Sequence, residues 1–233
     1  MESTTKDIRE CVHCGAIGPV TRDHVPPKAL FGKPRPALPT VVSCEACNGG
    51  ASDDDEYFRA MLLMHDTGGD HPDAVANRAA FFRSLARPKK LGFRKLILGG
   101  TRDVFVVAPD GVAERRGAFE VEGARLARVA TRVLRGMFYL KQGRRLRDEY
   151  VAQTALLGTR EREDDEEMRS LLAPALASPS TVIGAGVLEY WVHFEPDPGW
   201  SIWLFRYYGE IDFLGLTLPK AEADKALPQN GEI

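Results

Sequence analysis

Four cysteines lie in two short pairs near the start of the chain, and every cysteine of the protein belongs to one of these pairs. They are Cys11 with Cys14 and Cys44 with Cys47. Two pairs with this spacing can supply four thiolates to one Zn²⁺ ion in a closed, tetrahedral site. The alternative is four free thiols, which the paired use of all cysteines disfavours. We therefore predict a structural Zn²⁺ bound by all four, with His13 as a solvent-facing spacer inside the first pair.

Three further residues could support phosphodiester hydrolysis, which needs an activated water, a cation at the phosphate and a stabilised leaving oxygen. Histidine as a residue type has a pKa close to neutral, so His24 is a candidate general base. Asp23 precedes it, and Asn48 directly follows Cys47. Their carboxylate and amide oxygens suit Mg²⁺ or Mn²⁺. We predict Asp23, His24 and Asn48 as the catalytic set.

The order of these residues resembles the zinc-stapled variety of the HNH endonucleases, which have the ββα-metal fold. The resemblance covers about residues 8–60, from the first cysteine pair through the Asp-His dipeptide to the second pair, its Asn and a following helix. It implies a metal-dependent endonuclease that hydrolyses phosphodiester bonds in DNA. It also implies that His24 is the general base and that Asp23 and Asn48 hold the catalytic cation.

One position departs from the family pattern. Many members carry an Asn about five residues before the second cysteine pair, where it braces the loop that holds the base. Pro39 occupies that position here, and Thr40 follows with a hydroxyl that could brace the loop instead. Two other readings therefore stay open. One is a zinc-stapled nucleic-acid-binding protein with weak or no cutting activity, and the other is a protein-interaction domain on the same scaffold.

Hydrophobic periodicity and turn residues divide the chain into helices and strands. The predicted helices cover about 52–65, 74–86, 122–140 and 163–176. The predicted strands cover 20–25, 40–43, 104–108, 112–116, 187–194, 201–207 and 210–216. Ser52 is expected to cap the first helix, with carboxylates at 53–56 suiting the helix dipole. We predict an α+β fold, with a zinc-stapled HNH module at 1–65 and a mixed α+β domain at 66–233 that positions the substrate.

Charge is segregated along the chain, although its net value is only −2. Residues 74–102 and 123–147 each contain eight basic side chains and no acidic one. Such blocks can present a basic face to a phosphate backbone, or they can be solvated faces that form weak surface pairs. The first reading predicts DNA contacts, and it assigns them to these residues: Lys89, Lys90, Arg125, Arg128, Arg132 and Arg135.

The apolar runs are much shorter than the roughly 20 residues of a membrane span. The first seven residues have no apolar core of the kind found in signal peptides. We therefore expect a cytoplasmic protein with reduced thiols and without a membrane partner. DNA is the expected partner, and the sequence leaves open whether the protein is a homodimer.

Overall fold

The computed structural model describes residues 7–65, 70–107, 111–157, 166–197 and 199–223, and it has the mixed α+β fold that the sequence predicts. The helices are α1 (Glu45–Asn48), α2 (Ser52–Met64), α3 (Pro72–Leu85), α4 (Leu91–Leu98), α5 (Gly123–Gln142) and α7 (Glu166–Leu176). The strands are β1 (Ile8–Glu10), β2 (Ile17–His24), β3 (Thr40–Cys44), β4 (Arg102–Val107), β5 (Ala113–Ala118), β6 (Tyr150–Leu156), β7 (Thr181–Ile183), β8 (Leu188–Phe194), β9 (Ser201–Tyr207) and β10 (Ile211–Pro219).

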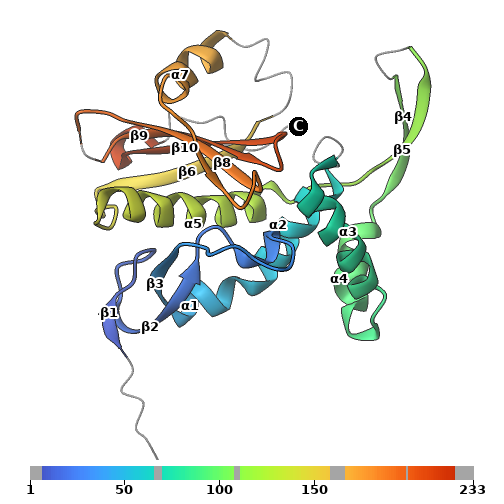
Figure 1. The fold of residues 1–233 in the computed structure, drawn as a ribbon, viewed down its shortest axis with the longest axis horizontal. Helices are drawn as coiled ribbons and strands as arrows, with labels where there is room; N and C mark the ends of the chain where they lie inside the picture. The colour runs from blue at the N-terminus through green and yellow to red at the C-terminus, as the bar shows by residue number, and fades with distance from the viewer. Residues whose placement is uncertain (1–6, 66–69, 108–110, 158–165, 198, 224–233) are drawn as a thin grey trace, which may run out of the picture.

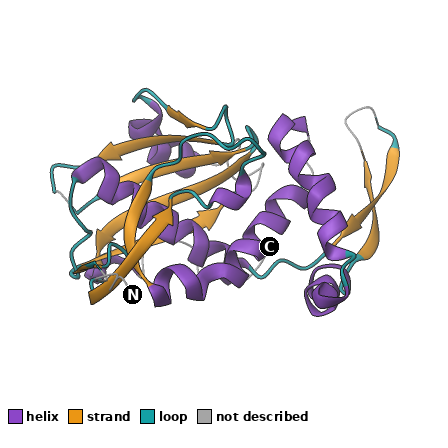
Figure 2. Ribbon diagram, turned by 60° about the horizontal axis from the view of Figure 1, so that its bottom comes forward, coloured by secondary structure: helices purple, strands orange, loops and turns teal. Residues whose placement is uncertain are grey.

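Helix α5 lies at the centre of the main body (Figure 1). On one side it packs against α2 and the three-stranded sheet β1-β2-β3. On the other side it covers a five-stranded antiparallel sheet in the order β6-β10-β9-β8-β7. Helix α7 packs on the far face of that sheet, against β8 and β9. Figure 2 shows the larger sheet and the helices beside it from a second direction.

The sequence of α5 explains this central position. Apolar residues follow the helical period on the face that packs on the sheet, and small residues let the opposite face approach the N-terminal part closely. Gly136 is the closest approach, because a Cβ atom built on it would lie 2.6 Å from Cγ2 of Val25. The helix ends at Gly143, whose φ of 65° is left-handed and whose amide donates to the carbonyl of Tyr139.

One hydrophobic core runs from the N-terminal part of the chain into the C-terminal sheet. It includes Val25 and Phe58 from residues 1–65, Phe138 from α5, and Trp203 and Phe213 from the sheet. A smaller cluster lies between α7 and the other face of the sheet. The boundary predicted at residue 65 follows the last residue of α2, but the core is continuous across it.

Most of the predicted elements are present within a few residues of their expected ends. The helix predicted over 163–176 is described from Glu166 onward, and the first residues of that range lie outside the described part. Strands β1, β6 and β7 and helices α1 and α4 were not predicted from the sequence. The expected cap Ser52 is instead the first residue of α2, because a 3₁₀ turn over Gly49–Ala51 leads directly into the helix and places Ala51 at the cap position.

Helices α3 and α4 and the hairpin β4–β5 extend to one side of the main body (Figure 1). The hairpin pairs Phe105 with Arg115 and Val106 with Glu114. Phe105 is 75% exposed, because neither face of this two-stranded ribbon is covered by a described element. Among the described residues, no helix combines the length and the apolar character that crossing a membrane would require.

We expect Gly136→Ala to destabilise the protein by about 1–3 kcal/mol, because the added methyl group overlaps the buried side chain of Val25. Gly123→Ala in the same helix is the matched control, since a Cβ atom there meets no atom within 4 Å. Denaturant unfolding of both variants measures the difference. Equal stability of the two variants would show that α5 and the N-terminal part do not pack as closely as described.

Candidate metal centre and its surroundings

The four cysteines converge on one point, as the sequence predicts. Cys11 and Cys14 flank the turn between β1 and β2, Cys44 ends β3, and Cys47 lies in α1. Their four Sγ atoms all lie within 4.8 Å of one another, and the Sγ atoms of Cys14 and Cys44 are 3.7 Å apart. Zn–S bonds of about 2.3 Å in a tetrahedron place the sulfur atoms roughly 3.8 Å apart. The cluster is therefore close enough to hold one metal ion such as zinc.

The pKa values of these thiols describe the cluster before a cation neutralises it. Burial opposes the thiolate of Cys11, but backbone amides around it stabilise that thiolate and lower its pKa to about 6. Burial raises the pKa of Cys47, and the neighbouring sulfurs raise it further. One thiolate therefore forms easily, and each further one is opposed by the charge already present. A cation at the centre removes this opposition.

His24 is the last residue of β2 and lies opposite Thr40 of β3. Its side chain is half-buried, and no residue in the described part of the chain forms a hydrogen bond or ion pair with its imidazole. The amide of the next residue, Val25, donates to the carbonyl of Pro39 at 3.0 Å. The backbone of Pro39 thus braces the segment after His24, although its side chain cannot replace the amide of an Asn.

Asn48 is attached to the strand that carries the other two predicted catalytic residues. Its Nδ2 donates to Oγ1 of Thr21 at 2.8 Å and to the carbonyl of Arg22 at 3.1 Å. Thr21 and Asp23 lie two residues apart on β2, so their side chains leave the same face of the strand. Asn48 and Asp23 therefore lie on one face, and His24 follows at the strand's end.

The carboxylate of Asp23 faces the interior. It is 5% exposed, and its Oδ2 lies 3.0 Å from Nε2 of His13 and 3.6 Å from Nε of Arg132. Arg132 belongs to α5 and also pairs with Asp55 of α2. A buried chain of charged and polar groups thus connects the first cysteine pair, β2, α5 and α2.

The expectation that His13 faces solvent is wrong. His13 is 5% exposed, and its carbonyl accepts a 2.6 Å hydrogen bond from Nη1 of Arg135. The physical reason is the burial of Asp23, since a buried carboxylate requires donors nearby and the knuckle between Cys11 and Cys14 provides one. The sequence signal for this contact is the histidine between Cys11 and Cys14. It is not needed as a ligand, because four thiols already complete the site.

The four arginines predicted to contact DNA line α5 and have partners within the protein. Arg125 and Arg128 both pair with Asp54, with Nε–Oδ distances of 2.7 Å. Arg125 also lies over the ring of Tyr57, at 4.3 Å from its centroid. Arg132 and Arg135 make the buried contacts described above. Of the other two predicted DNA contacts, Lys90 pairs with Glu56, whereas Lys89 is exposed.

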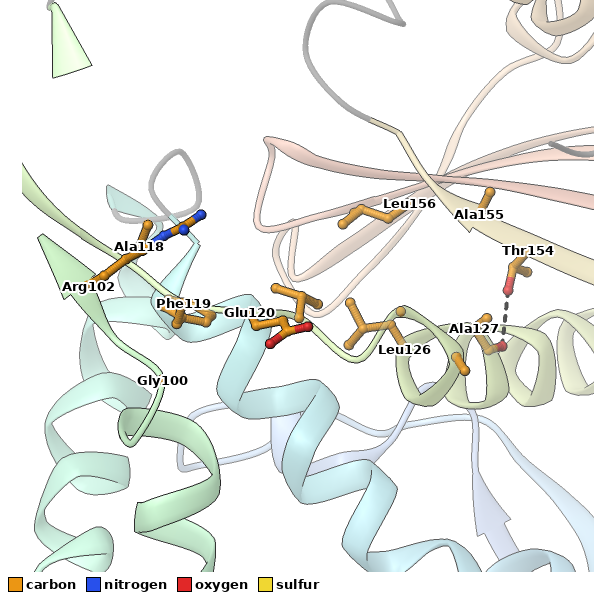
Figure 3. Close-up of a pocket in the computed structure, with 13 residues that line it drawn as sticks. Gly100, Arg102, Ala118, Phe119, Glu120, Leu126, Ala127, Thr154, Ala155 and Leu156 are labelled. Carbon is orange, nitrogen blue, oxygen red and sulfur yellow. Dashed lines mark hydrogen bonds between the residues drawn. The ribbon is translucent and has the colours of Figure 1, made fainter. Parts of the chain in front are cut away.

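A cavity of about 830 Å³ lies away from the cysteines, between the base of the β4–β5 hairpin, the start of α5 and β6 (Figure 3). Its charged lining residues are Arg102 and Glu120. Deeper inside, Oγ1 of Thr154 donates to the carbonyl of Ala127 at 3.1 Å. None of the predicted catalytic residues lines it, so the cavity and the cysteine site are separate.

Comparisons with known proteins identify no relative of this chain: no family, no curated protein and no solved structure matches it.

We expect purified protein to contain one zinc ion per chain, and Cys14→Ser to lose it, because a hydroxyl is a poor substitute for a thiolate ligand. Glu45→Ala is the control, since Glu45 is an exposed residue inside the second pair and is not part of the cluster. Elemental analysis of the three proteins decides the matter. Folded wild-type protein without bound metal would contradict the prediction.

The contact between α2 and α5 should depend on pH. Hydrogen bonds from Arg128 are the largest cause that lowers the pKa of Asp54 in the folded protein. A carboxylate with a lowered folded pKa stabilises the fold above its unfolded pKa of about 4, and this stabilisation is lost as the pH falls through the folded value. Asp54→Asn should therefore cost about 1 kcal/mol at pH 7 and nothing near pH 2, because the pair is partly exposed to solvent.

Asp53→Asn is the matched control for this measurement. It removes a charge from the same turn of α2, but the Asp53 carboxylate has no ion pair among the described residues. Its effect should be smaller than that of Asp54→Asn at pH 7. Urea unfolding at several pH values compares the two, and identical pH profiles would show that the arginine pairs on Asp54 do not contribute.

Proposed function

We propose that this protein is a metal-dependent endonuclease of the HNH type that hydrolyses phosphodiester bonds in DNA. His24 acts as the general base, and Asp23 and Asn48 are the residues that hold a catalytic Mg²⁺ or Mn²⁺. The cysteine cluster has a structural role and keeps β2, β3 and α1 in place. Helix α5 packs against α2 and β3 on one side and against the C-terminal sheet on the other, and so holds this arrangement in place.

The observation that carries the proposal is the attachment of Asn48 to β2. Asn48 follows the last cysteine of the cluster and bonds to the backbone of Arg22, two residues before His24. The hydrogen bond thereby fixes the Asn48 amide of α1 to β2, the strand that ends at His24. The imidazole has no protein partner in the described part of the chain, so its nitrogens are open to a water molecule.

In this mechanism the His24 imidazole accepts the proton of a water molecule as that water attacks the phosphorus atom. The cation, when bound, stabilises the negative charge that develops on the phosphate and on the leaving oxygen. Asn48 supplies a neutral amide oxygen to it, and Asp23 supplies a charged one. The hydrogen bond between the Val25 amide and the Pro39 carbonyl keeps the end of β2 in position while His24 gains and loses a proton.

A second candidate function has its own supporting observation. The Asp23 carboxylate is directed toward His13 and Arg132, and these contacts occupy one of its oxygens. If this is its only role, Asp23 connects the first cysteine pair to α5 and does not bind a catalytic cation. The protein would then be a zinc-stapled nucleic-acid-binding protein without cutting activity.

We expect the wild-type protein to nick supercoiled plasmid in the presence of Mg²⁺ or Mn²⁺. His24→Ala should lower the rate by roughly 100- to 10,000-fold, which is the usual contribution of a general base. The fold and the bound zinc should be unchanged, because His24 is half-buried and has no partner among the described side chains. Agarose gel analysis of nicked and linear products gives the rates.

His193→Ala is the matched control, since His193 lies on β8 of the C-terminal sheet and pairs with Glu195 at its surface. That variant should cut at the wild-type rate. Cutting by His24→Ala at the wild-type rate would overturn the assignment of the base. DNA binding without cutting by the wild-type protein with either metal would favour the second candidate function.

A further inference from the structure

Helix α5 offers little free positive charge to a ligand. Three of its arginines pair with carboxylates of α2, and the fourth, Arg135, donates to a backbone carbonyl of the first cysteine pair. Arg132 and Arg125 have side chains that are only 10% and 15% exposed, whereas the Arg128 side chain is 59% exposed and shares Asp54 with Arg125. A phosphate could reach them only after these contacts broke, which costs more than an exposed cation would require. The arginine row is therefore a contact within the protein.

A second group of cations has no such partners. It lies on the end of α3, the turn that follows and helix α4, and we refer to it as the α3–α4 basic group. Its members are Arg83, Arg87, Lys89, Arg94 and Lys95. All five are exposed, and within the described part of the chain no carboxylate pairs with any of them. The sequence from 74 to 102 contains no acidic residue, and the nearby Glu56 carboxylate of α2 pairs with Lys90, which is not a member of the group.

The α3–α4 basic group is connected to the segment that follows His24. After β2 the chain turns through a 3₁₀ turn that ends at Leu30, whose carbonyl accepts from Nδ2 of Asn77 on α3 at 3.0 Å. The amide of Gly32 donates to Oδ1 of Asp73 at the start of α3, at 2.7 Å. Asp73 is thereby engaged by the backbone. Helix α3 is thus attached to the same backbone segment that leaves the end of β2.

We propose that the α3–α4 basic group is the surface that holds the phosphate backbone of duplex DNA, and that the arginine row of α5 is not. This inference deepens the proposed function and rests on it for the identity of the ligand. Positive charge without neighbouring acids is what a polyanion selects, and it contributes without regard to base sequence. The start of α3 is attached to the segment that follows His24, and the basic group begins near the other end of this helix.

The apolar residues of the same region bear on the choice of partner. Phe82, Leu91, Leu96 and Leu98 are 41% to 49% exposed, and basic residues lie between them along the chain. A protein partner would be favoured by a continuous apolar surface with few cations at its centre. Five unpaired cations in a stretch without acids favour a phosphate backbone instead.

The test compares two triple variants that remove the same charge. Arg87→Ala/Lys89→Ala/Arg94→Ala changes the α3–α4 basic group. Arg147→Ala/Arg169→Ala/Lys220→Ala changes three exposed cations beside the C-terminal sheet. Both are made in the full chain with His24→Ala and measured without added Mg²⁺ or Mn²⁺, so that cutting plays no part and the structural metal is kept. Fluorescence anisotropy with a labelled DNA duplex gives the affinity at several salt concentrations.

The α3–α4 triple variant should bind more weakly, and its log–log salt slope should fall by about 0.9 for each lost phosphate contact, or up to about 2.7. The control triple variant should keep the slope of the His24→Ala parent. Equal slopes for all three proteins, or no DNA binding by the parent, would overturn the proposal. So would a change of oligomeric state in the α3–α4 variant by light scattering, since it would mark a protein contact.

This result is separate from the fate of the proposed function. DNA binding through the α3–α4 basic group without any cutting would support the binding surface and contradict the proposed nuclease activity. Cutting of plasmid DNA together with equal salt slopes for all three proteins would support the nuclease activity and contradict the proposed binding surface.

Discussion

A buried carboxylate loses its hydration and needs a cation beside it. The ion pairs that meet this need connect α2 to α5. Asp54 and Asp55 begin α2 at the place where that helix packs against α5. Arg125 and Arg132 meet them from α5, and Arg132 also reaches Asp23 on β2. A shift of α2 along α5 would leave charges without partners, which costs several kcal/mol for buried groups. The pairs therefore fix where β2, and the site at its end, lie relative to the sheet.

The same pairs explain why the sequence indicates some features and not others. The cysteine cluster could be predicted because two close pairs have few ways to be satisfied, and their spacing is local. The positive face of α5 was also visible in the sequence, but its partners were not, because they lie about 70 residues away along the chain. The burial of His13 follows from contacts with Asp23 and Arg135 that no local pattern encodes. Strand β6 was missed because its residues are partly buried on both faces, which removes the alternation that marks a strand.

Asp23 bears the most demanding combination of requirements in the proposed site. Its contacts with His13 and Arg132 orient the carboxylate, as the partners of metal ligands often do. The same contacts draw electron density away from an oxygen that a cation would use. Such contacts make the ligand more rigid but weaken its attraction for a cation. Asn48 carries no charge and therefore does not restore that attraction. In the proposed nuclease, the affinity for a catalytic cation would therefore be weak.

The continuous core has a consequence for the way the protein unfolds. Val25 and Val41, which flank the metal cluster on β2 and β3, belong to the same packed cluster as Trp203 in the sheet. Residues that share one packed core are coupled, so loss of structure in one part lowers the stability of the other. Removal of the metal would therefore weaken the sheet as well as the short strands around the cysteines. If the four cysteines hold a metal, the fluorescence of Trp203 would report its loss through the shared core.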